Sequence, residues 1–315
     1  MIRIVLFHAF LLCILPWEAD AVDIEIFPKY SFFSREDSAQ LILLRSGAEL
    51  DGPLSVRVLH HDDVLAQAEI QDAKRTIISF PLNAIPAGTH LLVAEIRDQS
   101  GRLREKYAEV TRLPAKPNEV KIDLETGGLI VDGLPFIPFG FYCSMPLGDL
   151  PEQEVVRGFN TIGPYQLNLP EGLADRKAYM DRCARLGLKV HYGLNSLVGS
   201  GHDGHESYQL TEDEKLDLLR QEVLAFRDHP ALLAWYINDE PIGQGRPLAE
   251  VQQAYDLVKE LDPHHPASIV FVIPERAGEV RSALDIAMTD PYPVPGPLDK
   301  VKTDVDHLTD HFARE

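Results

Sequence analysis

The chain has 315 residues, 45% of them hydrophobic and 25% charged, the composition of a folded globular protein large enough for two domains. Lys and Arg number 30 against 49 Asp and Glu, so the formal net charge is -19. A negative field of this size repels a phosphate backbone, which argues against a nucleic-acid partner and favours solubility.

The first 21 residues have the pattern of a secretory signal. Arg3 supplies a positive start, an apolar run extends from Ile4 to Pro16, and Ala19-Asp20-Ala21 offers a small-x-small cleavage site. The apolar run is shorter than the ~20 residues of a membrane span, and no later segment reaches that length. We therefore expect an exported protein, periplasmic or extracellular, with no membrane span.

Residues 22–116 are predicted to form an all-β sandwich. Segments of β-forming residues recur about every ten residues, and turn-rich stretches such as Gly47–Pro53 separate them. This region gathers no His, Cys or carboxylate with catalytic or metal-binding spacing, so we interpret it as an accessory domain. The expected strands are Asp23–Phe27, Ala39–Leu44, Leu54–Leu59, Thr76–Phe80, Leu91–Ile96 and Tyr107–Thr111.

Leu113-Pro114-Ala115-Lys116-Pro117 is a stiff connection that marks a domain boundary. From 117 to 315, strands alternate with amphipathic helices, which is typical of α/β architecture. Asp132-Gly133 predicts a hairpin that leads into the first barrel strand. The expected strands are Phe136–Phe141, Thr161–Ile162, Lys189–Gly193, Leu232–Ile237, Ser268–Ile273 and Asp285–Met288, and the expected helices are Asp175–Leu186, Thr211–Arg227, Leu248–Leu261 and Leu298–Phe312.

The fourth strand of this domain runs from apolar residues directly into Asn238-Asp239-Glu240-Pro241. In a parallel barrel the reactive side chains lie at the carboxyl ends of strands. Glycoside hydrolysis needs one carboxyl that protonates the leaving oxygen and a second that attacks or stabilises the sugar cation. Partial desolvation by Trp235 or Tyr236 would raise the pKa of Glu240 into the proton-donating range. The alternative is that Asp239 and Glu240 only cap the following loop or helix.

The segment Phe226–Pro241 resembles the fourth-strand region of clan A glycoside hydrolases, retaining enzymes with a TIM barrel that include β-galactosidases and endoglucanases. In that clan an Asn-Glu pair ends the strand. The resemblance therefore implies that Glu240 is the acid/base, while Asp239 replaces the usual Asn and would orient the sugar or Glu240. Gly128–Tyr142, Phe159–Ile162 and Asp290–Pro293 resemble the clan's barrel entry, second strand and sixth-strand end.

The resemblance implies hydrolysis of O-glycosidic bonds in oligo- or polysaccharides with retention, and it requires no cofactor or metal. The clan's nucleophilic Glu ends strand seven. Because an eightfold barrel needs ~250 residues, we expect a TIM-type (β/α)8 barrel that lacks about the last two strand–helix units, and with them the nucleophile. The alternative function is a non-catalytic, carbohydrate-binding barrel.

Further candidates for contact with the sugar lie near strand ends: Tyr142, His191, Asn195, Trp235, Asn238 and Tyr292. Tyr165 is placed like Tyr142 and Tyr292, and these three could instead be packing aromatics, as His191 could be a structural histidine. A third functional hypothesis is a metal-dependent hydrolase that uses His191, His202, Asp203 and His205. The other interpretation of Gly199–Gly204 is a substrate loop. We expect Cys143 and Cys183 to be free buried thiols, with a disulfide as the alternative.

Overall fold

The computed structural model describes residues 23–46, 52–71, 73–144, 148–198, 210–245, 247–292 and 296–312. The chain divides into two compact units, Met1–Lys29 with Glu36–Thr111, and Tyr30–Arg35 with Arg112–Glu315. The expected signal segment, residues 1–21, lies outside the described residues. None of the helices within the described ranges is long and apolar enough to cross a membrane.

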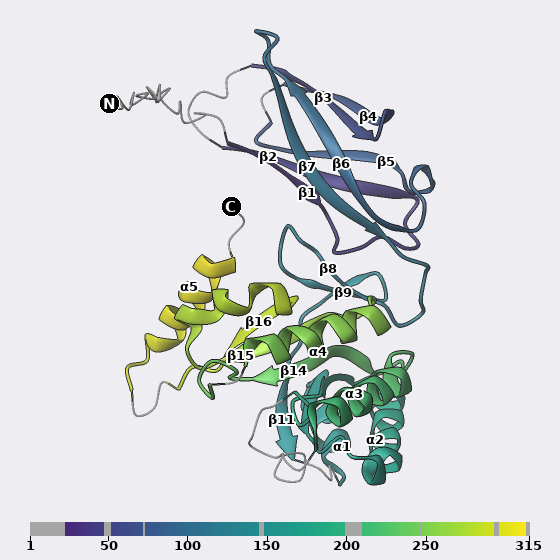
Figure 1. The fold of residues 1–315 in the computed structure, drawn as a ribbon, viewed down its shortest axis with the longest axis vertical. Helices are drawn as coiled ribbons and strands as arrows, with labels where there is room; N and C mark the ends of the chain where they lie inside the picture. The colour runs from purple at the N-terminus through teal and green to yellow at the C-terminus, as the bar shows by residue number, and fades with distance from the viewer. Residues whose placement is uncertain are drawn as a thin grey trace, which may run out of the picture. The chain divides into compact units, whose positions relative to one another are not determined.

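The first unit is all-β and contains two sheets, with strand orders β1-β2-β5 and β4-β3-β6-β7 (Figure 1). The pairs β1–β2, β2–β5, β3–β4 and β3–β6 are antiparallel. A short 3-10 helix, Leu82–Ala84, follows the fifth strand. The strands are β1 (Asp23–Pro28), β2 (Ser38–Ser46), β3 (Leu54–His60), β4 (Asp63–Ile70), β5 (Arg75–Pro81), β6 (Gly88–Arg97) and β7 (Leu103–Arg112).

Side chains of the first unit alternate between buried and more exposed positions along the strands. Leu54, Val56 and Val58 are buried in β3, and alternate residues of β2 and β6 are buried in the same way. This confirms the expected all-β region. The sequence prediction missed β4, because only Ile70 of its eight residues is buried and the strand carries little hydrophobic signal.

The second unit is built on a curled sheet of six strands in the order β11-β12-β13-β14-β15-β16 (Figure 1). All neighbouring pairs are parallel. This half-barrel confirms the predicted parallel α/β architecture. The central strand β14 is buried along its whole length, which explains its nearly continuous apolar sequence. The strands are β11 (Gly140–Ser144), β12 (Thr161–Tyr165), β13 (Lys189–Gly193), β14 (Leu232–Asp239), β15 (Ala267–Phe271) and β16 (Ile286–Thr289).

The helices of the second unit follow most of the predicted ranges. A capping box of Thr211 and Glu214 begins α3, and Gly187, with a φ of 74°, ends α2. The sequence did not predict α1, and β15 connects to β16 through a 3-10 helix, Pro274–Ala283. The α-helices are α1 (Leu150–Val156), α2 (Leu173–Leu186), α3 (Glu212–Phe226), α4 (Leu248–Leu261) and α5 (Lys300–Phe312), and a further 3-10 helix is Pro170–Gly172.

A small antiparallel sheet, β10-β9-β8, precedes the half-barrel. Its strands are β8 (Val120–Ile122), β9 (Leu129–Val131) and β10 (Leu134–Phe136). Asp132 and Gly133 both have positive φ, 53° and 78°, as expected for a two-residue hairpin turn, so the predicted hairpin is confirmed. The predicted start of the first barrel strand is wrong. Phe136 pairs with Leu129 in the hairpin, and β11 begins only at Gly140.

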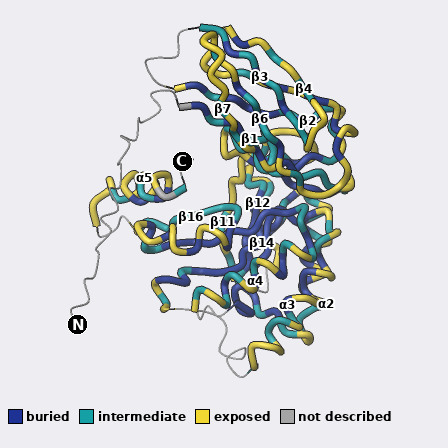
Figure 2. Tube along the Cα trace, turned by 45° about the horizontal axis from the view of Figure 1, so that its top comes forward, coloured by how far each residue is buried: buried dark blue, intermediate teal, exposed yellow. Residues whose placement is uncertain are grey.

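The main core of the second unit lies between the parallel sheet and the helices, around Tyr192, Val223, Phe226, Trp235 and Val258. Figure 2 shows buried residues along β14 and exposed residues on the outer sides of α2 and α3. Cys143 and Cys183 are free thiols, as expected, but only Cys183 is buried as predicted, while Cys143 is half-buried at the edge strand. With one face of the sheet covered by helices, the inner face and the carboxyl ends of the strands remain as places for a functional site.

Candidate functional site

Glu240 lies directly after β14, at the carboxyl end of the parallel sheet, and its side chain is half-buried. Its φ of 52° is left-handed, which is uncommon for a residue other than glycine. Two backbone hydrogen bonds hold this conformation: the Glu240 amide donates to Val270 O at 3.0 Å, and the Gln244 amide donates to Glu240 O at 2.9 Å. The structure thus places the expected acid/base where barrel chemistry occurs, in a strained backbone that its neighbours fix.

Asp239 is the last residue of β14 and is buried against two phenols. Burial, followed by the charge of Asp239, raises the pKa of Tyr165 to about 12. Burial also raises the pKa of Tyr236 far above its usual range, and the charge of Asp239 and a hydrogen bond to it add to the shift. Both phenols therefore keep their protons and can donate hydrogen bonds in a largely desolvated site.

Tyr142 and His191 meet on the inner face of the sheet. Ser268 Oγ donates to Trp235 O at 3.3 Å, so its 2.5 Å contact with His191 Nε2 is a bond that the imidazole donates. Nδ1 of His191 then accepts from the Tyr142 hydroxyl at 3.1 Å. Burial lowers the pKa of His191 to about 4, so the ring is neutral. His191 orients Tyr142 and is not a free acid or base.

A second polar contact between strand ends joins Asn238 to the turn that contains Asn195 and Val198. Asn238 is fully buried, and its Nδ2 donates to Val198 O at 2.6 Å, which ties the end of β14 to the turn after β13. Asn195 lies in that turn, 9% exposed, and its carbonyl accepts from the Val198 amide at 3.3 Å. Oδ1 of Asn238 is buried without a partner among the described residues.

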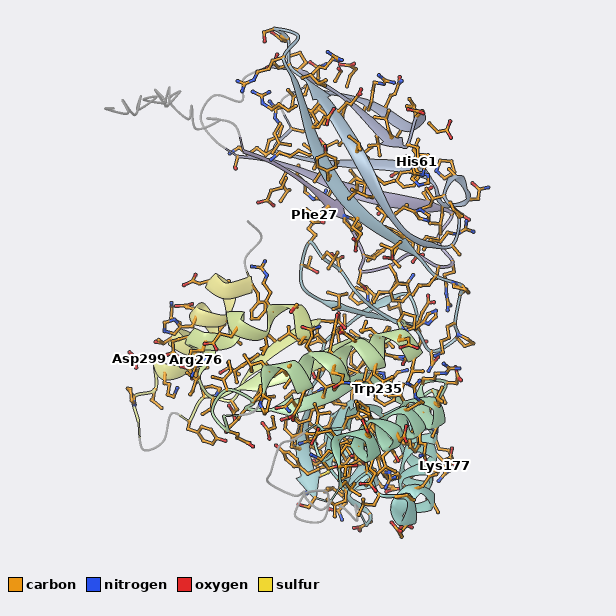
Figure 3. The ribbon with its side chains drawn as sticks, viewed as in Figure 1. Phe27, His61, Lys177, Trp235, Arg276 and Asp299 are labelled. Carbon is orange, nitrogen blue, oxygen red and sulfur yellow. The ribbon has the colours of Figure 1, made fainter. Side chains whose placement is uncertain are left out.

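Trp235 does not lie with these residues, contrary to its expected contact with the sugar. Its ring belongs to the core on the helical side of β14, with no exposed surface, and Nε1 donates to Asp262 Oδ2 at 2.9 Å (Figure 3). Successive residues of a strand point to opposite faces, so Tyr236 takes the inner face and Trp235 the outer one. Trp235 cannot therefore supply the desolvation expected at Glu240.

Tyr292 is largely exposed after β16, and its hydroxyl donates to Asp290 Oδ2 at 3.0 Å. That hydrogen bond is the main reason that the pKa of Tyr292 is raised, with smaller contributions from the charges of Glu240 and Asp239. The structure therefore brings Tyr292 and Asp290 into the same electrostatic environment as the two acids. Sequence reasoning gave Asp290 no role, although it follows a strand, as Asp239 and Glu240 do.

An apolar cavity of about 500 Å³ lies inside the second unit, beneath the strand ends. It extends from the β9–β10 hairpin to the inner face of the sheet, where Tyr142, His191 and Ser268 supply its polar atoms. Ser268 was missed at the sequence level, and its only signal is a hydroxyl in an otherwise apolar strand. The remaining lining residues are Gly127, Gly128, Leu129, Phe136, Ile137, Pro138, Gly140, Phe141, Thr161, Gly163, Leu233, Ala234, Ile286 and Met288.

The metal hypothesis named four possible ligands, and only one of them, His191, lies in the part of the chain that the structure describes. His202, Asp203 and His205 lie outside the described residues. Both ring nitrogens of His191 are already hydrogen-bonded, to Tyr142 and Ser268, which leaves neither free as a ligand. Within the described ranges no group of three or more His, Cys, Asp or Glu could hold a metal ion.

No protein-family profile and no curated protein sequence matches this chain. Among solved structures, a β-glucuronidase from an uncultured Clostridium species is 11% identical with a TM-score of 0.45, over 91% of this chain and 52% of that chain. A β-glucuronidase from Ruminococcus gnavus in complex with D-glucuronic acid is 14% identical, with a TM-score of 0.44, over 91% and 52%. The chain thus spans about half the length of these structures. At this identity and TM-score the likeness decides neither the activity nor the substrate of this chain.

Proposed function

We propose that the second unit is a glycoside hydrolase-like module that hydrolyses O-glycosidic bonds of oligo- or polysaccharides with retention. The placement of Glu240 is the observation that supports this most. Glu240 is a half-buried carboxyl in a left-handed backbone at the carboxyl end of β14, directly after the buried Asp239. Backbone strain of this kind concentrates at functional sites.

In the proposed reaction Glu240 protonates the leaving oxygen and later takes a proton from the attacking water. Asp239 accepts hydrogen bonds from the sugar or orients Glu240, while the protonated phenols of Tyr165 and Tyr236 stabilise its charge. Tyr142, whose hydroxyl His191 orients, offers an aromatic surface beside them. For retention, a second carboxylate must bond to the anomeric carbon as the leaving oxygen departs, and water later displaces it. The resemblance places this carboxylate on a seventh strand, so the proposed reaction needs that strand in addition to the six of the described sheet.

The acid role of Glu240 is tested with two leaving groups. We expect Glu240→Gln to reduce hydrolysis of methyl glycosides by about a thousandfold, because an alkoxide needs a proton on the departing oxygen. The first-turnover release of dinitrophenolate from 2,4-dinitrophenyl glycosides should persist, because this group leaves without protonation. Later turnovers should slow, because the same carboxyl is proposed to take the proton from the attacking water. Glu260→Gln, a change of the same kind on the exposed side of α4, is the matched control and should alter neither rate.

Two outcomes would contradict the proposal. Equal loss of the first-turnover rate on both classes of glycoside would remove the acid role from Glu240. If the unmodified protein binds oligosaccharides in calorimetry but releases no sugar from any of them, the second unit is a carbohydrate-binding barrel and not an enzyme.

A further inference from the structure

A buried polar network connects the helical layer of the second unit to the carboxyl ends of three strands. At its centre lies the carboxylate of Glu222 on α3, which accepts from Nε of Arg176 at 3.1 Å, from Nη2 of Arg176 and from the Tyr192 hydroxyl at 2.6 Å. Arg176 and Glu222 are 2% and 4% exposed, so their charges compensate each other away from water. Lys177, the next residue of α2, marks this region in Figure 3.

Arg176 also holds the loop that follows β12. Its Nη1 donates to Leu167 O at 2.8 Å, and its Nη2 donates to Leu169 O at 2.9 Å. Asn168, between these two residues, is 1% exposed, and its Nδ2 lies 3.4 Å from Glu222 Oε2. The buried ion pair therefore determines where the amide of Asn168 lies.

Asn168 is hydrogen-bonded to the turn that follows β13. Its Nδ2 donates to Gly193 O at 3.1 Å, and its backbone amide donates to Ser196 Oγ at 3.1 Å. Ser196 Oγ donates in return to Asn168 Oδ1 at 2.6 Å. Because both ends of this contact are buried, the side chains of Asn168 and Ser196 have few other partners available.

The turn after β13 in turn contacts β14. Val198 O, two residues beyond Ser196, accepts from Asn238 Nδ2 at 2.6 Å. Asn238 lies two residues before Glu240, whose φ of 52° is a conformation that an unsupported residue would leave. Hydrogen bonds thus lead from Glu222 through Asn168 to Ser196, the backbone of the turn carries the path on to Val198, and a further hydrogen bond joins Val198 to Asn238.

We propose that Arg176 and Glu222 are positioning residues: through Asn168 and Ser196 they hold Asn238, and with it the left-handed backbone of Glu240. The pair lies on the helical side of the sheet, where its hydrogen bonds go to Leu167, Asn168, Leu169 and Tyr192. Its effect is therefore on the geometry of Glu240 and not on binding contacts.

Amide hydrogen exchange tests this path without any need for turnover. Ser196→Ala removes the two hydrogen bonds between Asn168 and Ser196 and leaves the Arg176–Glu222 pair and the bond from Asn168 to Gly193 O in place. We expect exchange in residues 194–198 and 239–244 to become about tenfold faster, as loss of one hydrogen bond implies, while α4 keeps its protection. Glu222→Gln should produce the same local pattern.

Ser282→Ala is the matched control. Ser282 Oγ donates to Gln252 Oε1 over the same 2.6 Å, but this bond lies between the Pro274–Ala283 helix and α4, off the path. We expect unchanged exchange in 239–244 for this variant. If Ser196→Ala accelerates 194–198 but not 239–244, the path does not reach Glu240. If exchange rises equally across the whole unit, the network only stabilises the fold, and either result overturns the proposal.

This inference names the support of the proposed acid/base, but its measurement does not depend on that function. Faster exchange at 239–244 in a protein that hydrolyses no glycoside would uphold the positioning role and reject the enzyme. If hydrolysis is present, Ser196→Ala should lower kcat with little change in KM, because the sugar-binding surfaces are intact.

Discussion

The Tyr142 hydroxyl on the edge strand β11 donates a hydrogen bond to Nδ1 of His191 on β13, over 3.1 Å. Ser268 Oγ holds the other ring nitrogen at 2.5 Å, and its own proton goes to Trp235 O on β14. One chain of hydrogen bonds therefore joins four strands on the inner face of the sheet, and burial lowers the pKa of the imidazole so that it is neutral.

We expect His191 to make folding stability fall with acidity. Its pKa is about 4 in the folded protein against an ordinary value of 6.5, so between these pH values the unfolded chain binds a proton that the folded protein does not. Stability therefore rises with pH through this window, and roughly 3 kcal/mol is lost by pH 4. Urea unfolding at pH 7, 5.5 and 4.5 should show a shallower pH dependence for His191→Gln, and parallel curves would contradict this assignment.

Gly163 determines where the Tyr142 ring can lie. A Cβ at this position would lie 2.6 Å from Cδ1 and 2.7 Å from Cε1 of Tyr142, closer than real atoms approach. We expect Gly163→Ala to displace the ring, break its bond to His191 and weaken glycoside binding about tenfold, at a stability cost of roughly 1–3 kcal/mol. Gly128→Ala, where the nearest atom is Oγ1 of the exposed Thr126 at 3.3 Å, is the control for a change in the same cavity. Calorimetry and a crystal structure of each variant would check both effects.

We expect the left-handed backbone at Glu240 to lower the stability of the folded protein. A left-handed residue with a Cβ costs about 1 kcal/mol more than glycine in the same conformation. We therefore expect Glu240→Gly to be more stable than Glu240→Ala by about 1 kcal/mol in thermal or urea unfolding. Both variants lack the carboxyl and should be equally deficient in hydrolysis. Equal stabilities would show that the conformation at residue 240 is not strained.

We expect Trp235→Phe to lower the free energy of unfolding without changing the affinity for a glycoside. The substitution removes the hydrogen bond to Asp262 and leaves a buried carboxylate with one donor fewer, so we expect a loss of roughly 2–4 kcal/mol in unfolding free energy. The indole faces the helices, so the dissociation constant of any bound glycoside should not change. A weaker affinity with unchanged stability would place Trp235 back in the sugar site.

Much of the second unit could be predicted because its strands and helices differ sharply in pattern. Lys189–Gly193 and Leu248–Leu261 match their predicted bounds, and the apolar run into Asp239 and Glu240 marked the end of β14. In a strand buried on both faces, apolar residues point to either side, so the sequence shows no alternation of apolar and polar residues. The sequence could therefore not predict which face each residue of β14 occupies. The register shift between Tyr236 and Asn238 adds to that difficulty.

The network around Glu222 could not be predicted either. Arg176 and Glu222 are charged residues on amphipathic helices, and sequence alone places such residues in solvent. Their burial depends on hydrogen-bond partners in two separate loops, Leu167–Leu169 and Gly193–Ser196, that only the folded chain brings together. The contact between Asn168 and Ser196, 28 residues apart, has no local signature.

The chain has two tryptophans, Trp17 and Trp235, and only Trp235 lies in the described part. Its indole is wholly enclosed, with its N–H on a carboxylate, so its fluorescence should be blue-shifted in the native protein and move to longer wavelength on denaturation. In a Trp17→Phe chain this emission would report the second unit alone. The all-β unit, which has no tryptophan among its described residues, would then contribute no tryptophan emission. Comparison of emission with far-ultraviolet circular dichroism would then show whether the two units melt together or in separate steps.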